Sequence, residues 1–552
     1  MGHDGWMVVT HDVVNQPPEL EDYDVFGADA VLVEGVERES AGWAVDELHA
    51  LGRLAGASQT IEWGFDANRF PPELRTHDRF GNRVDRISYH PAYHELMRVA
   101  IAHGLHAAPW ADGRQGAHVA RAAAFIVWSQ VEAGHGCPIS MTYSIVPALR
   151  AQPELSAMWE PKLVARTYDP RDVPVDAKAG AIAGMGMTEK QGGSDVRANT
   201  TRAEPVGDGL WRLTGHKWFC SAPMSDVFLV LAQAPGGLSC FLVPRWLPEG
   251  SRNAGFRIVR LKDKLGNRSN ASGEVELDGA AAWLVGEEGR GVRTIIEMVA
   301  HTRLDCVLGA TATIRQATAQ ALHHCAHRQA FGKVLADQPL MRIVLADLVV
   351  ESEAATVTAL RLARAFDDAA RGDDIAQAFR RLATAVGKYW VCKRQPTVVG
   401  EALECLGGNG YVEESIMPRL FRESPLNGIW EGSGNVICLD VLRAVAREPQ
   451  ALAAFFDELD TTAGADPRLD AAVGRARTDL ADLGGIEARA RRIVEAMALA
   501  FQGSLLVRHG HPAVAEAFLA SRLSGDEGLA LGTLPAGVDV GAIIERARPK
   551  AA

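Results

Sequence analysis

The feature that most constrains this fold is a change of sequence character along the 552 residues, from helical to strand-like and back. Between residues 181 and 285, short apolar runs at 211–214, 227–232, 240–243 and 273–277 alternate with Gly, Pro, Asn and Asp. Short strands bounded by turn residues are typical of an antiparallel barrel or sandwich. A chain of this length with a strand-rich centre is expected to form two to four domains.

The sequence on both sides of this segment has helical character. Residues 1–180 contain apolar-periodic stretches at 94–110 and 115–134. After residue 285, four long segments rich in Ala and Leu predict an antiparallel four-helix bundle. These segments are 292–328, 338–370, 374–405 and 434–447.

A further helical tract follows the bundle and ends in a Gly- and Pro-containing tail from about residue 524. We therefore predict an α+β protein with four domains. They are an N-terminal helical domain (1–180), a middle β domain (181–285), a helical bundle (286–445) and a helical extension (446–552).

Composition narrows the functional classes. The net charge of −12 argues against nucleic-acid binding by the whole surface, which needs clustered Lys and Arg. No apolar run approaches the roughly 20 residues of a membrane span, and the first six residues lack the layout of a signal peptide. Eight scattered cysteines without a Cys-x-x-Cys pair indicate reduced thiols. We expect a cytoplasmic protein that makes no membrane contact.

One cluster, His323, His324, Cys325 and His327, resembles a metal site, since two of the histidines are four residues apart and could share a helix face. No second ligand cluster has matching spacing, and Arg328 follows directly. We predict no metal here, and favour a helix face near an anionic partner.

Two segments of the middle domain could contact a flat, phosphorylated ligand. The run 184–195 offers two hydroxyls and paired glycines, which could cradle a polar ring and a phosphate through backbone N–H groups. In the run 215–221 an aromatic residue precedes a hydroxyl by two positions. Taken alone, the first run is more typical of a glycine-rich loop before a strand. The second is either an ordinary strand or a wall on which a ring stacks while Ser221 donates a hydrogen bond. No Gly-x-Gly-x-x-Gly follows a predicted strand, and no Gly-x-Ser-x-Gly occurs, which disfavours a Rossmann site and an α/β-hydrolase.

The segment 429–435, Ile-Trp-Glu-Gly-Ser-Gly-Asn, places one carboxylate, Glu431, in an apolar and glycine-rich setting. Burial there would favour the neutral carboxyl and bring its pKa towards the range of a general base. The following glycines would let a ligand approach the backbone. In isolation a solvated turn is the commoner meaning of such a segment.

The order of these segments resembles the flavin-dependent acyl-CoA dehydrogenase family. Its Thr-Glu-x-x-x-Gly-Ser-Asp segment is similar to 188–195, and its Lys-x-Trp-Ile-Thr strand to 217–221. Its Arg-x-x-Phe-Gly segment is similar to 328–332, and its Gln-x-x-Gly-Gly-x-Gly-Tyr signature to 404–411. The resemblance covers roughly residues 90–445 and implies the family's three-part fold.

The sequence departs from the family pattern at five of these positions. Lys190 and Gln191 stand where Pro and Gly are usual, while Phe219 replaces Trp and Ser221 replaces Thr, so an aromatic ring and a hydroxyl are retained. Glu404 replaces Gln, which leaves the role of that side chain open.

Four segments resemble one branch of the family in particular, the AidB-like flavoproteins associated with DNA alkylation stress. They are 15–18, 186–195, 262–271 and 429–435. That branch also carries an additional C-terminal helical domain, which residues 446–552 would form.

The resemblance implies FAD as cofactor and a homotetramer in which Arg328 reaches the FAD pyrophosphate held by a neighbouring subunit, as a bidentate guanidinium can. It assigns to FAD the residues Met187, Thr188, Gly193, Ser194, Phe219, Ser221, Arg328, Phe331, Gln338, Glu404, Gly407, Gly408, Trp430, Ser433 and Asn435.

The resemblance also implies the chemistry. Glu431 would remove the α-proton of a short or branched acyl-CoA thioester while a hydride leaves the β-carbon for FAD, giving the trans-enoyl-CoA. The thioester carbonyl would be polarised by the Glu431 N–H and a ribityl hydroxyl of the flavin in a dry site. Some relatives carry the base on the helix of Thr302, but threonine cannot serve as one. Arg303 is the candidate for substrate binding, or equally a cation that caps a helix or bridges two domains.

A second hypothesis is an AidB-type flavoprotein that binds and protects DNA, with weak dehydrogenase activity. The extension 446–552 has slightly more acidic than basic residues, although Arg489, Arg491 and Arg492, or Arg546, Arg548 and Lys550, form local basic clusters. On a helix, such clusters are usually a solvated face. A structural oligomer that retains only a flavin fold is a third alternative. The sequence does not specify the electron acceptor.

Overall fold

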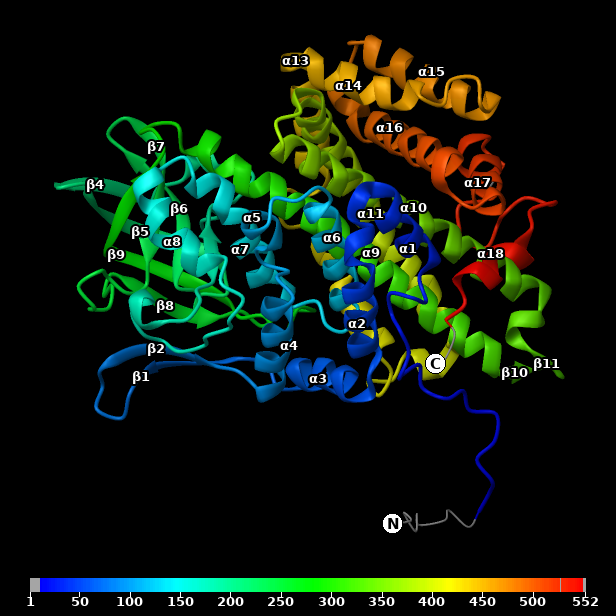
Figure 1. Cartoon of the computed structure of the whole chain (residues 1–552), viewed down its shortest axis with the longest axis horizontal. Coiled ribbons are helices and arrows are strands. Elements are labelled where there is room, and N and C mark those ends of the chain that lie inside the picture. The colour runs from blue at the N-terminus through cyan, green and yellow to red at the C-terminus, as the bar shows by residue number, and fades with distance from the viewer. Residues whose placement is uncertain (1–9, 527, 550–552) are drawn as a thin grey trace.

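The computed structural model describes residues 10–526 and 528–549; the first six residues and Lys550, considered above, lie outside this range. Figure 1 shows a β-barrel at one end of the molecule, long helices through its centre, and the C-terminal extension packed along the helices. Within the described residues, no helix is both long and apolar enough to cross a bilayer.

The N-terminal region consists of helices, as predicted, and one unpredicted hairpin. The hairpin pairs β1 (Glu73–His77) with β2 (Arg83–Ser88) through a turn in which Asp78 accepts hydrogen bonds from the N–H groups of Phe80 and Asn82. The helices are α1 Ala30–Val36, α2 Val45–Gly56, α3 Ser58–Arg69, α4 Pro91–Ala102, α5 Ala108–Ala111, α6 Ala117–Ser129, α7 Gly136–Leu149 and α8 Pro153–Leu163.

The middle region forms a mostly antiparallel barrel. Its strands are β3 Ala183–Gly186, β4 Arg202–Gly207, β5 Leu210–Ser221, β6 Val227–Ala234, β7 Gly237–Pro244, β8 Phe256–Leu261 and β9 Ser272–Val285. The strand order is β3-β6-β4-β5-β9-β7, and the additional pairing of β6 with β7 closes the ring. β3 runs parallel to β6, and one pair of residues joins β4 to β6 in parallel. The sequence predicted an antiparallel barrel, and these two pairings depart from it.

The helical bundle matches the four predicted segments within a few residues. Its helices are α9 Gly291–His327, α10 Pro339–Ala370, α11 Asp374–Cys405 and α13 Gly434–Arg447, with the short α12 Met417–Glu423 between the last two. A small hairpin, β10 Gln329–Ala330 and β11 Lys333–Val334, joins α9 to α10. Short π and 3-10 turns are η1 Glu37–Ala41, η2 Gly42–Ala44, η3 Val175–Ala177, η4 Val196–Ala198, η5 Leu335–Asp337, η6 Gly407–Gly410, η7 Leu426–Gly428 and η8 Leu519–Leu523.

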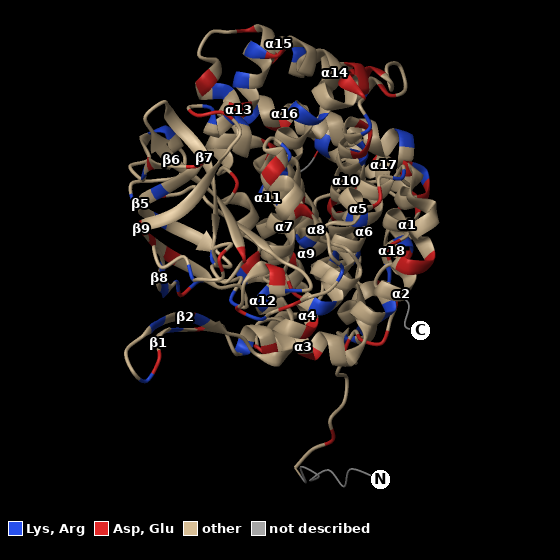
Figure 2. Ribbon diagram, turned by 60° about the vertical axis from the view of Figure 1, so that its left-hand side comes forward, with Lys and Arg blue, Asp and Glu red and all other residues tan. Residues whose placement is uncertain are grey.

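The extension adds α14 Pro449–Asp460, α15 Pro467–Ala481, α16 Ile486–His509, α17 Pro512–Phe518 and α18 Val540–Ala547. The predicted C-terminal tail thus contains a helix, α18. Arg546 on α18 forms ion pairs with Glu34 and Glu353, which attach the end of the chain to α1 and α10. Figure 2 shows acidic and basic residues side by side on α15 and α16, whereas the charged residues of α14 are all acidic.

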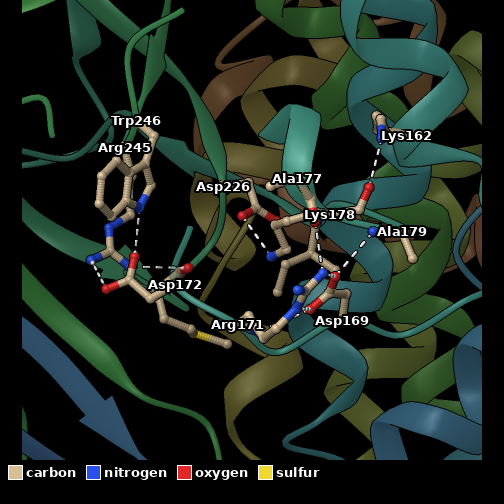
Figure 3. Close-up of polar contacts among 12 residues, drawn as sticks. Lys162, Asp169, Arg171, Asp172, Ala177, Lys178, Ala179, Asp226, Arg245 and Trp246 are labelled. Atoms are coloured by element: carbon tan, nitrogen blue, oxygen red, sulfur yellow. Dashed lines mark hydrogen bonds and ion pairs between the residues drawn. The ribbon is translucent and has the colours of Figure 1, made fainter. Parts of the chain in front are cut away.

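The Pro- and Asp-rich segment between α8 and β3 is tied to both neighbouring domains (Figure 3). Lys178 Nζ lies 2.7 Å from Asp226 Oδ1 in the barrel region, and Lys162 on α8 donates to the Lys178 carbonyl at 2.6 Å. Asp172 accepts a hydrogen bond from the Trp246 indole N–H at 2.8 Å. These contacts fix the barrel relative to the N-terminal helices.

Candidate active site

Glu431 lies in the short loop between η7 and α13, and its backbone is in the left-handed region with φ +56°. A non-glycine residue held in that region costs about 1–3 kcal/mol and persists only where its surroundings enforce it. Gly432 follows with φ +108°, a conformation that favours glycine. The glycines noted in the sequence therefore shape the turn that presents the carboxylate.

The Glu431 carboxylate is partly buried and receives one side-chain hydrogen bond. Thr302 Oγ, on α9, donates to Glu431 Oε2 at 2.8 Å, although the Val299 carbonyl also lies within its reach at 3.1 Å. Burial raises the pKa of Glu431, and it outweighs the opposing effects of the Thr302 hydrogen bond and of the Arg303 and Lys388 charges. The raised pKa is the direction expected for a general base.

Two cations hold the backbone of this loop. Arg303 Nε, on α9, donates to the Glu431 carbonyl at 3.0 Å, and Lys388 Nζ, on α11, donates to the carbonyls of Trp430 at 2.9 Å and Gly432 at 2.5 Å. Three successive carbonyls therefore face cations from two helices of the bundle. Arg303 also pairs with Asp440 at 2.8 Å, so it bridges α9 to α13. These contacts join two helices of the same bundle and do not test the predicted substrate-binding role.

An apolar cluster joins the barrel to the base loop. Met187, at the start of the candidate cofactor loop, and Trp430, next to the base, both pack against the same buried group of side chains, which includes Cys137 on α7. The Cys137 thiol lies against the Ser221 and Asn270 side chains, and burial, together with the charge of nearby Glu431, raises its pKa. The structure therefore brings Met187, Ser221, Trp430 and Glu431 to one region.

The loop that follows β3 is anchored by a buried ion pair. Lys217 Nζ, on β5, lies 2.8 Å from Glu189 Oε1, and both side chains are almost fully buried. Burial opposes ionisation of Glu189, yet the Lys217 charge and several hydrogen bonds lower its pKa to about 2. Residues 190–195 beyond the anchor are exposed, including Gly193 and Ser194. A Cβ on Gly193 would lie 2.3 Å from Thr188 Oγ, so any larger residue would require the Thr188 side chain to shift.

The aromatic residues at the end of β5 lie in an irregularity of the strand pairing between Lys217 and Cys220. Phe219 is half exposed, and Lys262 Nζ lies 4.5 Å from its ring centre and 3.5 Å from that of Trp218. The bulge presents an aromatic ring and a cation beside the Ser221 hydroxyl.

The remaining candidates gather at the far end of α9 and α11. Arg328, at the end of α9, donates to the Asn15 carbonyl, and Asn15 Oδ1 accepts from the Gln329 N–H at 2.8 Å. Phe331 is fully exposed on the β10–β11 hairpin, and Gln338 Nε2 donates to the Ala330 carbonyl at 3.0 Å. Glu404, Gly407 and Gly408 are exposed at the end of α11, whose Cys405 carbonyl lies 3.8 Å from Cys325 Sγ of α9.

One chain does not bring the two groups of candidates together. Figure 1 shows the β10–β11 hairpin on the opposite side of the molecule from the barrel. The segment 15–18, which the sequence marked only as branch-specific, packs at the Arg328 end: Gln16 accepts from Asn409, and the Pro18 carbonyl pairs with His323. The rings of His323 and His327 lie there with their centres 4.5 Å apart and their planes at 49°.

The last two candidates, Ser433 and Asn435, follow the base at the start of α13. Ser433 is the N-cap residue of α13, without a side-chain capping bond. The Asn435 Oδ1 atom accepts a hydrogen bond from Arg491 Nε of the extension at 2.7 Å, which links the base loop to α16.

Sequence reasoning missed Lys388, Cys137 and the Glu189–Lys217 pair. Lys388 is 43 residues from Glu431 in the chain and carries no local motif, so no signal in the sequence identifies it. Glu189 lies in the family-like segment 188–195 and Lys217 in the segment 217–221. The occurrence of both segments in one chain was the signal from which their contact could have been predicted.

Comparisons with known proteins identify related sequences and structures. Three family models match the chain: the adaptive response protein AidB N-terminal domain over residues 15–170, the acyl-CoA dehydrogenase middle domain over 184–280 and the acyl-CoA dehydrogenase C-terminal domain over 289–446. The putative acyl-CoA dehydrogenase AidB of Escherichia coli is 46% identical over 511 residues, which are 92% of this chain and 94% of that protein.

Two results concern Caenorhabditis elegans. Its acyl-CoA dehydrogenase family member 11 is 31% identical over 422 residues, which are 74% of this chain and 68% of that protein. The crystal structure of ACDH-11 in complex with C11-CoA superposes with a TM-score of 0.83 at 26% identity, covering 98% of this chain and 93% of that one.

The helical domain, β-barrel and helical bundle occur in the order of these family models, which define a class of flavin-dependent dehydrogenases of acyl thioesters. The chain belongs to the acyl-CoA dehydrogenase family. Within that family it falls in the AidB-like branch, as the N-terminal match and the E. coli relative show. It is an FAD-dependent oxidoreductase acting on CH–CH groups.

The residues of the barrel face fit FAD. In the exposed loop 190–195 the N–H groups of Lys190 and Gly192 donate to His216 and Glu189, which leaves those of residues 191 and 193–195 to a ligand. The half-exposed Phe219 ring offers an aromatic contact, and the Ser221 hydroxyl offers a polar one. When bound, FAD accepts the hydride that leaves the substrate.

Proposed function

We propose that this site dehydrogenates short or branched acyl-CoA thioesters between Cα and Cβ, with Glu431 as the base. The observation that supports it best is the Glu431 carboxylate itself. Thr302 holds one oxygen, while the other oxygen accepts no hydrogen bond from any described residue. Its pKa is raised by burial. A positioned carboxylate with one free oxygen suits removal of an α-proton.

The backbone beside this carboxylate offers the second requirement, a donor for the thioester carbonyl. No acceptor in the described part of the chain pairs with the Glu431 N–H. An unpaired N–H beside the base can bind the carbonyl oxygen, where charge accumulates as the α-proton leaves. We assign the Glu431 N–H this role. Arg303 acts from behind the loop by holding the Glu431 carbonyl.

Anaerobic titration of the purified protein with acyl-CoAs of graded length and branching tests the proposal. We expect stoichiometric bleaching of the flavin absorption band by four- or five-carbon straight or branched thioesters. Since a solved relative holds C11-CoA, chains up to eleven carbons belong in the series. A bound flavin that none of these thioesters bleaches would exclude the proposal.

We also propose a cytoplasmic homotetramer in which two subunits share each FAD. The β10–β11 hairpin, which directly follows Arg328 and carries the exposed Phe331, lies on the opposite side of the molecule from the barrel, so it can contact the barrel face of a neighbouring subunit. Native mass spectrometry of the holoprotein gives the subunit count, and a monomer with full FAD occupancy would contradict the sharing.

The alternative, DNA binding by the extension, gains little from the structure. Arg489 pairs with Asp482, and Arg546 pairs with Glu34 and Glu353. These two side chains are therefore engaged within the chain, while Arg491 and Arg492 are exposed. Binding of duplex DNA that weakens steeply with added salt would restore this alternative.

A further inference from the structure

Lys388 is a buried lysine whose hydrogen bonds with described residues all go to backbone carbonyls, although its charge also acts on the Glu431 carboxyl. It lies in the middle of α11 with 1% of its surface exposed. Its Nζ donates to the carbonyls of Trp430 and Gly432, and it forms no ion pair with a described carboxylate. A buried ammonium without a carboxylate partner is costly. The cost suggests a role that a neutral side chain could not fill.

The geometry of the peptide group indicates that role. The Trp430 carbonyl and the Glu431 N–H belong to the same trans peptide, so they point in opposite directions across one plane. Lys388 lies on the carbonyl side, 2.9 Å from the oxygen, and the unpaired N–H points away from it. A cation at the oxygen draws electron density from the amide and makes its N–H a stronger donor, because hydrogen bonds in a chain polarise one another.

The same cation also fixes the loop. Lys388 joins the carbonyls that precede and follow Glu431, while Arg303 holds the Glu431 carbonyl between them. This arrangement opposes relaxation of the left-handed Glu431 backbone. The N–H therefore stays oriented before substrate arrives, as an oxyanion donor must be.

We propose that Lys388 is a positioning residue that strengthens the Glu431 N–H as the donor to the thioester carbonyl, by binding the opposite end of the same peptide group. This inference rests on the proposed function, because it requires the Glu431 N–H to contact the thioester. It gives a role in substrate activation to Lys388, a residue of α11 that lies outside all of the sequence motifs described above.

The test compares Lys388→Met, Lys388→Gln and the matched control Lys162→Met, each with FAD bound. Lys162 also donates to one backbone carbonyl, that of Lys178, but in the segment between α8 and the barrel (Figure 3). The direct readout is the infrared carbonyl stretch of bound butanoyl-CoA and isobutanoyl-CoA labelled with ¹³C at the thioester carbon. It is measured in a Glu431→Gln background, which removes the base and keeps the backbone donor.

We expect the Lys388→Met change to move the bound carbonyl stretch towards its value in water, and Lys388→Gln, which keeps one neutral donor, to move it less. With Glu431 intact, Lys388→Met should lower the rate constant of flavin reduction roughly 10- to 100-fold with little change in thioester affinity. Lys162→Met should leave both readouts unchanged. A carbonyl stretch that is the same with and without Lys388 would overturn the inference.

The outcomes separate this inference from the proposed function. If no thioester reduces the wild-type flavin but the labelled carbonyl still shifts on binding, dehydrogenation fails and the role of Lys388 is still decided by the infrared comparison. If the wild type is reduced and the Lys388→Met rate stays within about twofold of it, the proposed function stands and the inference fails. Should Lys388→Met lose FAD, the Lys388→Gln variant decides the comparison.

Discussion

At the scale of the residue, the carboxylate of Glu431 is the group on which the proposed chemistry depends. Its replacement by Gln keeps the size of the side chain and the backbone N–H but removes the proton acceptor. We expect Glu431→Gln to retain FAD and acyl-CoA binding and to lower the rate constant of thioester-driven flavin reduction by at least about 10³-fold. Stopped-flow absorbance measures it. Reduction at the wild-type rate would remove Glu431 from its assigned role.

Thr302 should tune this base. Its hydroxyl stabilises the charged form of Glu431, so a Thr302→Val change raises a pKa that burial has already raised. Since only the carboxylate can accept the α-proton, the acid limb of the pH–rate profile should move to higher pH by about one unit.

A matched control lies on the same helix. Thr313 is buried on α9 and donates to the Gly309 carbonyl within that helix, so Thr313→Val removes a similar hydroxyl away from the base. Its pH–rate profile should coincide with that of the wild type. An acid limb that moves equally in both variants would point to a general effect on the helix and against tuning by Thr302.

The sequence supports Glu431 and the flavin segments because each is a contiguous motif. The sequence does not predict that Thr302 donates a hydrogen bond to Glu431, because the two residues are 129 positions apart. It does not predict the contacts of Lys388 either, which reach up to 44 positions along the chain. Such pairs depend on how three helices pack. The sequence predicts an aromatic ring at Phe219 and a hydroxyl at Ser221, but it does not predict the bulge that exposes the ring.

At the scale of the element, the turn after β3 depends on the buried pair of Glu189 and Lys217. The change Lys217→Met keeps the length of the side chain but leaves a buried carboxylate without its partner. We expect a loss of about 3–5 kcal/mol of unfolding free energy and weaker FAD retention, because residues 190–195 lose their anchor. Thermal unfolding and flavin fluorescence report the two effects.

Two further variants sharpen that comparison. Adding Glu189→Gln to Lys217→Met removes the unpaired charge and should restore part of the stability. Arg477→Met breaks an exposed ion pair with Asp460 and should cost no more than about 1 kcal/mol. Equal losses from the buried and exposed pairs would contradict the anchoring role.

Secondary structure was most predictable where it is longest. The bundle helices α9, α10 and α11 follow the predicted segments because Ala- and Leu-rich runs of 32 to 37 residues have few alternatives. The β1–β2 hairpin was not predicted, since its strands are short and largely exposed and lack an apolar alternation. Helix α18 was missed because eight residues inside a Gly- and Pro-containing tail give little periodic signal.

At the scale of the whole molecule, the two groups of flavin candidates lie at opposite sides of one chain, and the extension is attached by buried arginines. Arg522 pairs with Asp347 and Glu351, while Arg546 pairs with Glu34 and Glu353. Since these contacts cross from the extension to α1 and α10, the last hundred residues are part of the core assembly. Its stability should therefore respond to the charge state of the buried acids.

Glu353 is the buried acid for which we can state the pH range over which folding stability should change. Burial raises its pKa from 4.5 to about 7, although Arg546 opposes the shift, and its Oε2 atom is buried without a hydrogen bond. Between pH 4.5 and 7 the folded chain holds a proton that the unfolded chain releases. The stabilisation is therefore complete below about pH 4.5 and is lost as pH rises through 7, by at most about 3 kcal/mol.

The variant Glu353→Gln cannot titrate, so it should lose less stability than the wild type between pH 5 and 8. We expect the Tm of the variant minus that of the wild type to increase across this range. Glu545→Gln, on the exposed side of α18 beside Arg548, is the control and should show a difference independent of pH. Differential scanning fluorimetry at constant ionic strength measures both. A Glu353→Gln difference that stays flat or decreases with pH would show that α18 docks without a proton on Glu353.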